Sequence, residues 1–156
     1  MSSLSPREAA ERDQVGRAIG IGLLISIALF HLLDGVSQFH KHPFVFALYV
    51  ALMAGTLAVA LLLLRTDSRL AWGLVALMAG LTFTAFTLSR TTGLPNFHDD
   101  VGNWTDPLGL SSLFVEGLAT LLGLYKVATT PRIRHGTRGL VAAATGAAAG
   151  AKEEIA

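Results

Sequence analysis

The sequence predicts an all-α fold, a polytopic membrane protein built as a four-transmembrane-helix bundle with both termini in the cytoplasm. Of its 156 residues, 52% are hydrophobic and only 15% are charged, whereas a soluble domain has about 25% charged residues. The mean hydropathy is +0.55. Apolar stretches of roughly the 20 residues that a spanning helix needs occur at four places along the chain.

The four stretches follow one another with short connections. The first extends over residues 18–39 and the second over residues 44–64. The third covers residues 70–89, and the fourth, slightly shorter, covers residues 107–125. None has Lys or Arg in its interior, and none alternates polar and apolar residues as the strands of a β-barrel do. Each stretch is therefore predicted to be a spanning helix.

The distribution of positive charges predicts the orientation, because cytoplasmic loops of membrane proteins are rich in Lys and Arg. Nine cations lie before the first stretch, between the second and third, or soon after the fourth; the other two connections contain only Lys41 and Arg90. Both termini are thus expected in the cytoplasm. The predicted segments are a cytoplasmic N-terminal segment at 1–17, the transmembrane domain at 18–125 and a cytoplasmic Ala/Gly-rich tail at 126–156.

Residues at the ends of the stretches fit helix boundaries. Ser5-Pro6-Arg7-Glu8 has the pattern of a capping box with proline at the first helical position, which predicts a short helix leading into the first span. Asp106 before Pro107 can accept hydrogen bonds from free N–H groups of the fourth helix. Trp72 and Tyr125 are expected in the inner aromatic belt and Trp104 in the outer one. Residues 139–156 are expected to form a poorly ordered tail or a fraying surface helix.

Ionisable side chains inside spanning helices are costly and therefore informative. His31 and Asp34 lie on one face of the first helix. At about 1.5 Å per residue from Arg17, they lie roughly 21 and 26 Å into a core about 30 Å thick, in its outer third. Glu116 lies near the midplane of the fourth helix, and we expect it to face the bundle interior because a carboxylate in lipid is unfavourable.

A polar cluster of His31, Asp34, Arg90 and Glu116 is therefore predicted near the outer face. Grouping these side chains costs less free energy than placing each one separately in hydrocarbon. Arg90 would then form an ion pair with Asp34 or Glu116, or else extend to the lipid headgroups as an ordinary arginine at a helix end.

Three interpretations of this cluster remain open from the sequence. The polar groups hold the helices together, or they line a proton or ion path, or they bind a metal or a small ligand. For a metal, the candidate ligands are His31, Asp34, His98 and Glu116, which suit a divalent transition metal such as zinc, copper or nickel. No standard ligand motif such as H-E-x-x-H occurs in the sequence.

The segment Ser89-Arg90-Thr91-Thr92-Gly93-Leu94-Pro95, together with the embedded His31 and Glu116, resembles small four-helix integral membrane proteins of bacteria. The resemblance covers residues 18–125. It implies the same topology and no established activity. The frequent use of Ala, Gly, Leu and Arg is also typical of a high-GC bacterial genome, so the inner (plasma) membrane is the expected location.

The sequence excludes several functions. Cysteine is absent, which rules out disulfides and thiolate chemistry, and a net charge of +1 provides no basic field for nucleic acid. We expect a non-enzymatic membrane protein with no catalytic residues, an accessory subunit or a binder of a metal or small ligand, in contact with the bilayer and with a larger complex or its own copies. The alternative is a proton-coupled transporter or intramembrane enzyme using His31, Asp34 and Glu116.

Overall fold

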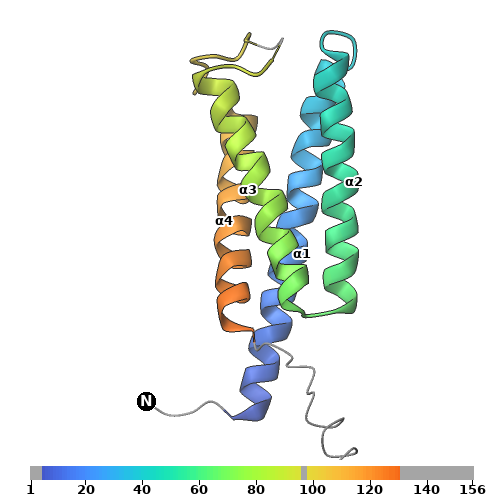
Figure 1. Ribbon diagram of the computed structural model, residues 1–156, viewed down its shortest axis with the longest axis vertical. Coiled ribbons are helices and arrows are strands. Elements are labelled where there is room, and N and C mark those ends of the chain that lie inside the picture. Colours follow the sequence, from blue (N-terminus) through green and yellow to red (C-terminus); the bar gives the residue numbers. More distant parts are fainter. Residues whose placement is uncertain (1–4, 96–97, 131–156) are drawn as a thin grey trace, which may run out of the picture.

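The four predicted helices are present in the computed structural model, which describes residues 5–95 and 98–130. They are α1 (Pro6–Gln38), α2 (Pro43–Arg65), α3 (Arg69–Thr91) and α4 (Pro107–Thr129). The helices run alternately up and down, and α1 extends beyond the other three at the end of the bundle where the α2–α3 connection lies (Figure 1). The described part of the chain is therefore an all-α bundle.

Each helix is long and apolar enough to cross a membrane. The candidate spans are Ala10–Val36 within α1 and the whole of α2, α3 and α4. Many large apolar side chains point away from the bundle, among them Leu61, Phe114 and Leu121, each more than half exposed. An apolar outer surface on this scale suits contact with lipid. The four candidate spans suggest a multi-pass membrane protein.

The caps expected from the sequence are present. The Ser5 hydroxyl accepts a hydrogen bond from the Glu8 N–H, and the Ser5 N–H donates to the Glu8 carboxylate. Helix α1 is continuous from Pro6, so the predicted lead-in helix and the first span are one element. The Asp106 carboxylate accepts from the N–H groups of Leu108 and Gly109 at 3.1 and 3.2 Å. These carboxylates stabilise the helix starts by accepting bonds from groups that have no intrahelical partner.

The expectation for Trp72 is wrong. Its side chain is fully buried in the bundle core with Leu24 and Leu63, and its indole N–H donates to Asp67. Gly20 of α1 makes this possible, because a Cβ there would lie 2.8 Å from the indole ring. Tyr125, by contrast, is about half exposed. The predicted tail at residues 139–156 lies outside the described part of the chain.

Helices α3 and α4 approach closely. At Gly123 a Cβ would lie only 2.7 Å from the backbone nitrogen of Ala76, so the two backbones touch where the glycine lacks a side chain. Toward the end that carries the α1–α2 and α3–α4 connections, the α3–α4 pair moves away from the α1–α2 pair (Figure 1). This divergence leaves space for the cavity described next.

Candidate ligand-binding cavity

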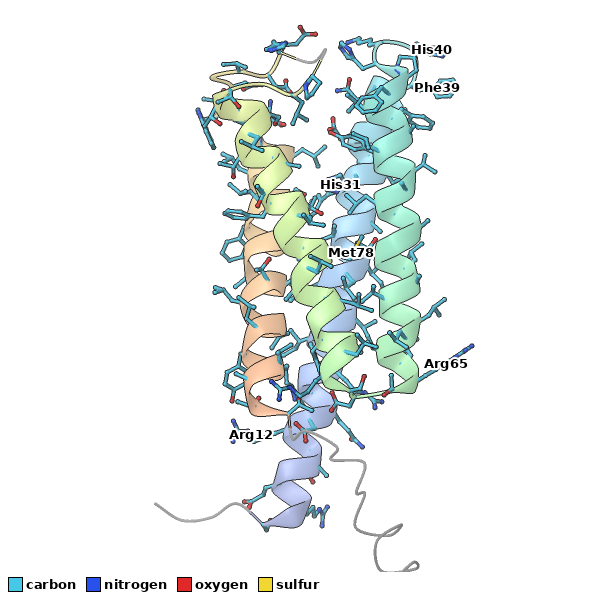
Figure 2. All side chains as sticks on the ribbon, in the orientation of Figure 1. Arg12, His31, Phe39, His40, Arg65 and Met78 are labelled. Carbon is cyan, nitrogen blue, oxygen red and sulfur yellow. The ribbon has the colours of Figure 1, made fainter. Side chains whose placement is uncertain are left out.

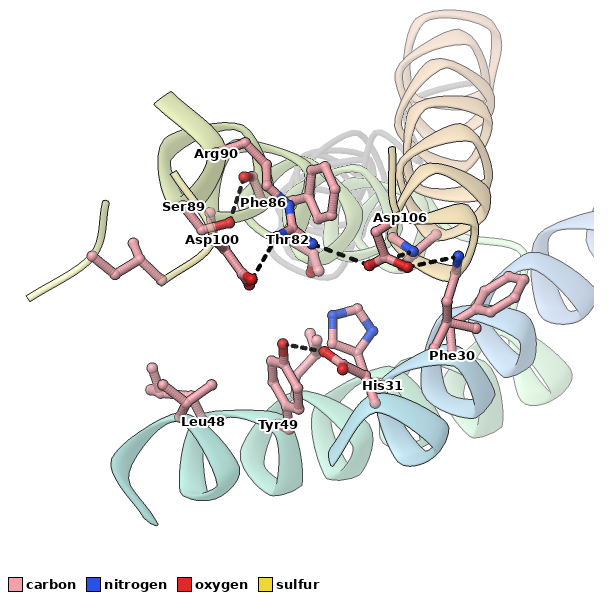
Figure 3. Close-up of a pocket in the computed structure, with 18 of the residues that line it drawn as sticks. Phe30, His31, Leu48, Tyr49, Thr82, Phe86, Ser89, Arg90, Asp100 and Asp106 are labelled. Carbon is pink, nitrogen blue, oxygen red and sulfur yellow. Dashed lines mark hydrogen bonds and ion pairs between the residues drawn. The ribbon is translucent and has the colours of Figure 1, made fainter. Parts of the chain in front are cut away.

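A cavity of about 240 Å³ lies between the two helix pairs, and all four helices contribute to its wall. Most of the wall is apolar, with aromatic rings from Phe30 of α1, Tyr49 of α2 and Phe86 of α3. Polar groups from several elements also line it (Figure 3). The charged or titratable residues of the wall are His31, Asp34, Tyr49, Arg90, Asp100 and Asp106.

His31, Asp34 and Arg90 therefore contribute to one cavity, although their helices are far apart in sequence. His31 projects between the helix pairs, whereas the charged side chains of Arg12 and Arg65 lie toward the opposite end of the bundle (Figure 2). The remaining member of the predicted cluster, Glu116, contacts His31 from α4. The arrangement combines an apolar pocket with a few convergent polar groups, which is typical of small-molecule sites.

Arg90 is buried, with 6% of its side chain exposed, and its ion partners differ from those expected. Its Nη1 lies 2.8 Å from Asp100 and its Nη2 lies 3.2 Å from Asp106. The guanidinium also stacks over Phe86, 4.8 Å from the ring centre. The partners are thus two carboxylates of the α3–α4 connection rather than Asp34 or Glu116. Because that connection folds back over the end of α3, it supplies anions that counting positions along helices does not reveal.

Asp34 accepts a hydrogen bond from the Tyr49 hydroxyl at 2.7 Å. The Tyr49 ring also meets the His31 ring edge to face, with 5.0 Å between their centres. Tyr49 is not among the site residues expected from the sequence. Tyr49 and Thr56 are the only hydroxyl side chains of the apolar stretch at residues 44–64, and a phenol hydroxyl there is the signal that could have identified Tyr49.

His31, which lines the cavity, contacts Glu116 of α4, which lies behind the cavity wall. The Nε2 atom of His31 lies 3.8 Å from Oε1 of Glu116, which also accepts a hydrogen bond from Ser112 at 2.7 Å. Glu116 is fully buried, so it faces the bundle interior as expected. Its Oε2 atom is buried without a hydrogen-bond partner in the described part of the chain.

The four candidate metal ligands are not brought together. His31 and Glu116 are neighbours, but Asp34 is bonded to Tyr49, and His98 lies against Gly93 in the α3–α4 connection. Among the residues that the structure describes, no group of three or more His, Asp or Glu side chains could hold a metal ion. Within residues 5–95 and 98–130, the geometry therefore does not provide the ligand set that a divalent metal needs.

A second polar contact lies at the opposite end of the bundle and was not predicted. The Lys126 ammonium of α4 is 2.7 Å from the Asp13 carboxylate of α1 and 5.5 Å from the centre of the Trp72 ring. The Lys126 side chain passes over Gly16, where a Cβ would lie 2.7 Å from its Cε atom. This ion pair joins α4 to α1 at the end of the bundle away from the cavity.

No protein-family model matches this chain, and no curated protein or solved structure is detectably similar to it. What the protein does is therefore inferred from the side chains themselves.

Proposed function

We propose that this is a multi-pass protein of the bacterial plasma membrane that binds a small ligand in the cavity between its two helix pairs, alone or as an accessory subunit of a larger membrane complex. The observation that carries the proposal is the cavity of about 240 Å³, which combines apolar and aromatic walls with the buried guanidinium of Arg90. Non-polar walls supply the free energy of binding, and a few fixed polar groups orient the ligand.

The charge distribution supports an outward-facing cavity. The cavity lies toward the α1–α2 and α3–α4 connections, where the cations are Lys41 and Arg90. The opposite end carries Arg65, Arg69 and Lys126. By the positive-inside rule, that cation-rich end faces the cytoplasm. A ligand would then enter from the exported side or laterally from the outer leaflet.

Binding rather than catalysis fits the way the polar groups are held. The Asp106 carboxylate accepts from two backbone N–H groups as well as from Arg90. The Tyr49 hydroxyl donates to Asp34. Groups fixed in this way provide a rigid polar frame for recognition.

Saturable photolabelling tests the proposal. The probe is a small neutral aryl diazirine, 3-(trifluoromethyl)-3-phenyldiazirine, added to the protein in phosphatidylcholine nanodiscs. We expect saturable labelling of Tyr49 and Phe86, which line the cavity on facing helices, over a non-saturable background on lipid-facing residues. The Ala85→Phe variant places a ring in the cavity wall and should abolish the saturable labelling.

The matched control is Thr84→Phe, which adds a ring at the preceding position of α3, at an exposed residue that does not line the cavity. This variant should label like the wild type. Labelling of Tyr49 and Phe86 that never saturates, or that is equal in Ala85→Phe and the wild type, contradicts the proposal.

A proton-coupled transporter is the second candidate, and the observation that favours it is the buried contact between His31 and Glu116. Protonatable groups inside a membrane frequently mark proton relays. In proteoliposomes with an imposed pH gradient, this function predicts a proton flux that Glu116→Gln abolishes. An equal flux in the wild type, the variant and empty liposomes excludes it.

A further inference from the structure

We propose that the ligand of this cavity is a small organic cation, an ammonium group carrying an apolar or aromatic substituent. This inference rests on the proposed function above and adds the chemical class of the ligand. It follows from the sign of the charges on the wall, from the way Arg90 is already neutralised, and from the aromatic rings opposite the carboxylates.

The charged groups of the wall are predominantly acidic. Three carboxylates line the cavity, those of Asp34, Asp100 and Asp106, against one guanidinium, that of Arg90. The carboxylates remain in excess whether or not His31 carries a proton. Below them, the fully buried Glu116 adds another carboxyl group, which is in contact with His31. In a cavity with mostly apolar walls, this excess attracts a positive ligand and repels a negative one.

Arg90 does not make the cavity an anion site. Two carboxylates lie against its guanidinium, at 2.8 and 3.2 Å, and Phe86 covers one face of it. Nε and Nη1 of Arg90 are buried without a hydrogen-bond partner in the described part of the chain, but an anion that approached them would remain close to the carboxylates of Asp100 and Asp106 and be repelled by both. The guanidinium therefore anchors the α3–α4 connection over the cavity rather than acting as a free charge.

The remaining walls fit the body of an organic ammonium. Phe30 and Tyr49 present aromatic rings from α1 and α2, and aliphatic side chains such as Leu52 and Leu81 complete the surface. The faces of aromatic rings attract ammonium groups, most strongly where water is excluded. The cavity of about 240 Å³ is smaller than the roughly 300–1,000 Å³ of typical ligand pockets, which limits the ligand to a small molecule.

A series of equal-shaped probes tests the sign of the charge. Benzyltrimethylammonium is a cation, neopentylbenzene is its neutral isostere, and phenylmethanesulfonate is an anion of similar shape. Each is titrated against the saturable diazirine labelling of Tyr49 and Phe86 in phosphatidylcholine nanodiscs. We expect the cation to displace the label, and the anion to be at least about tenfold weaker.

The affinity for benzyltrimethylammonium is then divided by the affinity for neopentylbenzene, and this ratio is compared between the wild type and Asp34→Asn. Each probe partitions equally into the bilayer around both proteins, so partition cancels in the comparison. The ratio should fall about tenfold in Asp34→Asn. The control is Asp99→Asn, since Asp99 is exposed and paired with His42 outside the cavity wall. Its ratio should equal that of the wild type.

The outcomes separate this inference from the proposed function. Saturable labelling that the cation does not displace, tighter binding of the sulfonate, or an unchanged ratio in Asp34→Asn overturns the cation inference and leaves a cavity that binds other molecules. Labelling that does not saturate in the wild type overturns the proposed function itself. Circular dichroism of Asp34→Asn checks that the helices are intact, and Asp100→Asn, at another carboxylate of the cavity wall, replaces it if they are not.

Discussion

The imidazole Nε2 of His31 lies 3.8 Å from Oε1 of Glu116, across the interface between α1 and α4. The other ring nitrogen, Nδ1, is 2.9 Å from the carbonyl oxygen of Ile27. A carbonyl only accepts hydrogen bonds, so Nδ1 carries a proton. In the neutral ring Nε2 then presents a lone pair to the carboxyl group. A favourable contact therefore requires a proton between the two side chains.

The first prediction concerns Glu116. Replacing it by Leu keeps a similar volume but leaves both His31 and the Ser112 hydroxyl without their buried partner. We expect Glu116→Leu to lower the free energy of unfolding by about 1–3 kcal/mol, measured by denaturant titration in detergent with circular dichroism. Ser111→Leu, at the exposed neighbour of Ser112 on the same helix, should change it little. Equal stability of the two variants contradicts a bonding role for Glu116.

Arg90 provides the second prediction. Lysine keeps the positive charge but cannot span Asp100 and Asp106 with a planar fork, nor stack on Phe86 in the same way. Arg90→Lys should therefore reduce the free energy of unfolding by about 1–3 kcal/mol. Arg65→Lys is the matched control, because Arg65 is exposed at the other end of the bundle. A similar loss in both variants would mean that Arg90 acts only as a charge.

Sequence patterns predicted the helices well because each is long, apolar and marked at its ends. The carboxylate caps at Ser5–Glu8 and at Asp106 follow from local chemistry within a few residues, so they could be found without a structure. The inward direction of Glu116 follows from one strong energetic term, the cost of a carboxyl group in lipid.

The partners of the polar groups could not be predicted in the same way. Arg90 is paired with Asp100 and Asp106, and the choice depends on how the α3–α4 connection folds back, which no helical periodicity encodes. Trp72 is buried because Gly20 lies opposite it on another helix. Both results depend on contacts that a helix makes outside itself, which the pattern of residues along the sequence does not reveal.

A third prediction uses the glycines. At Gly123 a Cβ would lie 2.7 Å from the backbone nitrogen of Ala76, whereas at Gly22 nothing lies within 4 Å. Gly123→Ala should force α3 and α4 apart and destabilise the protein by about 1–3 kcal/mol. Gly22→Ala should leave stability unchanged or raise it by up to about 1 kcal/mol, since alanine favours the helix. Thermal unfolding of both variants in one detergent compares them; destabilisation of similar size would contradict the close contact at Gly123.

The fourth prediction concerns the start of α1. The hydrogen bonds from the Ser5 hydroxyl and N–H stabilise the charged carboxylate and lower the pKa of Glu8 below its ordinary value of 4.5. Because the pKa of Glu8 is lower in the folded state, the charged carboxylate stabilises the folded helix start at pH values above the ordinary pKa of 4.5. This stabilisation is lost as the pH falls through the folded-state pKa of Glu8. In an NMR titration of the side-chain carboxyl, Ser5→Ala should raise the pKa of Glu8 toward 4.5. An unchanged titration curve contradicts the capping box.

The most direct test of an outward-opening cavity uses the absence of cysteine in the chain. Ser89 is buried but lines the cavity, whereas Ala76 is buried in the contact between α3 and α4. Single variants Ser89→Cys and Ala76→Cys are treated in intact cells with the membrane-impermeant reagent methanethiosulfonate ethyltrimethylammonium. We predict modification of Ser89→Cys from outside, blocked by adding Ala85→Phe, and no modification of Ala76→Cys. Modification of Ser89→Cys only after the cells are permeabilised, or no faster than that of Ala76→Cys, would contradict it.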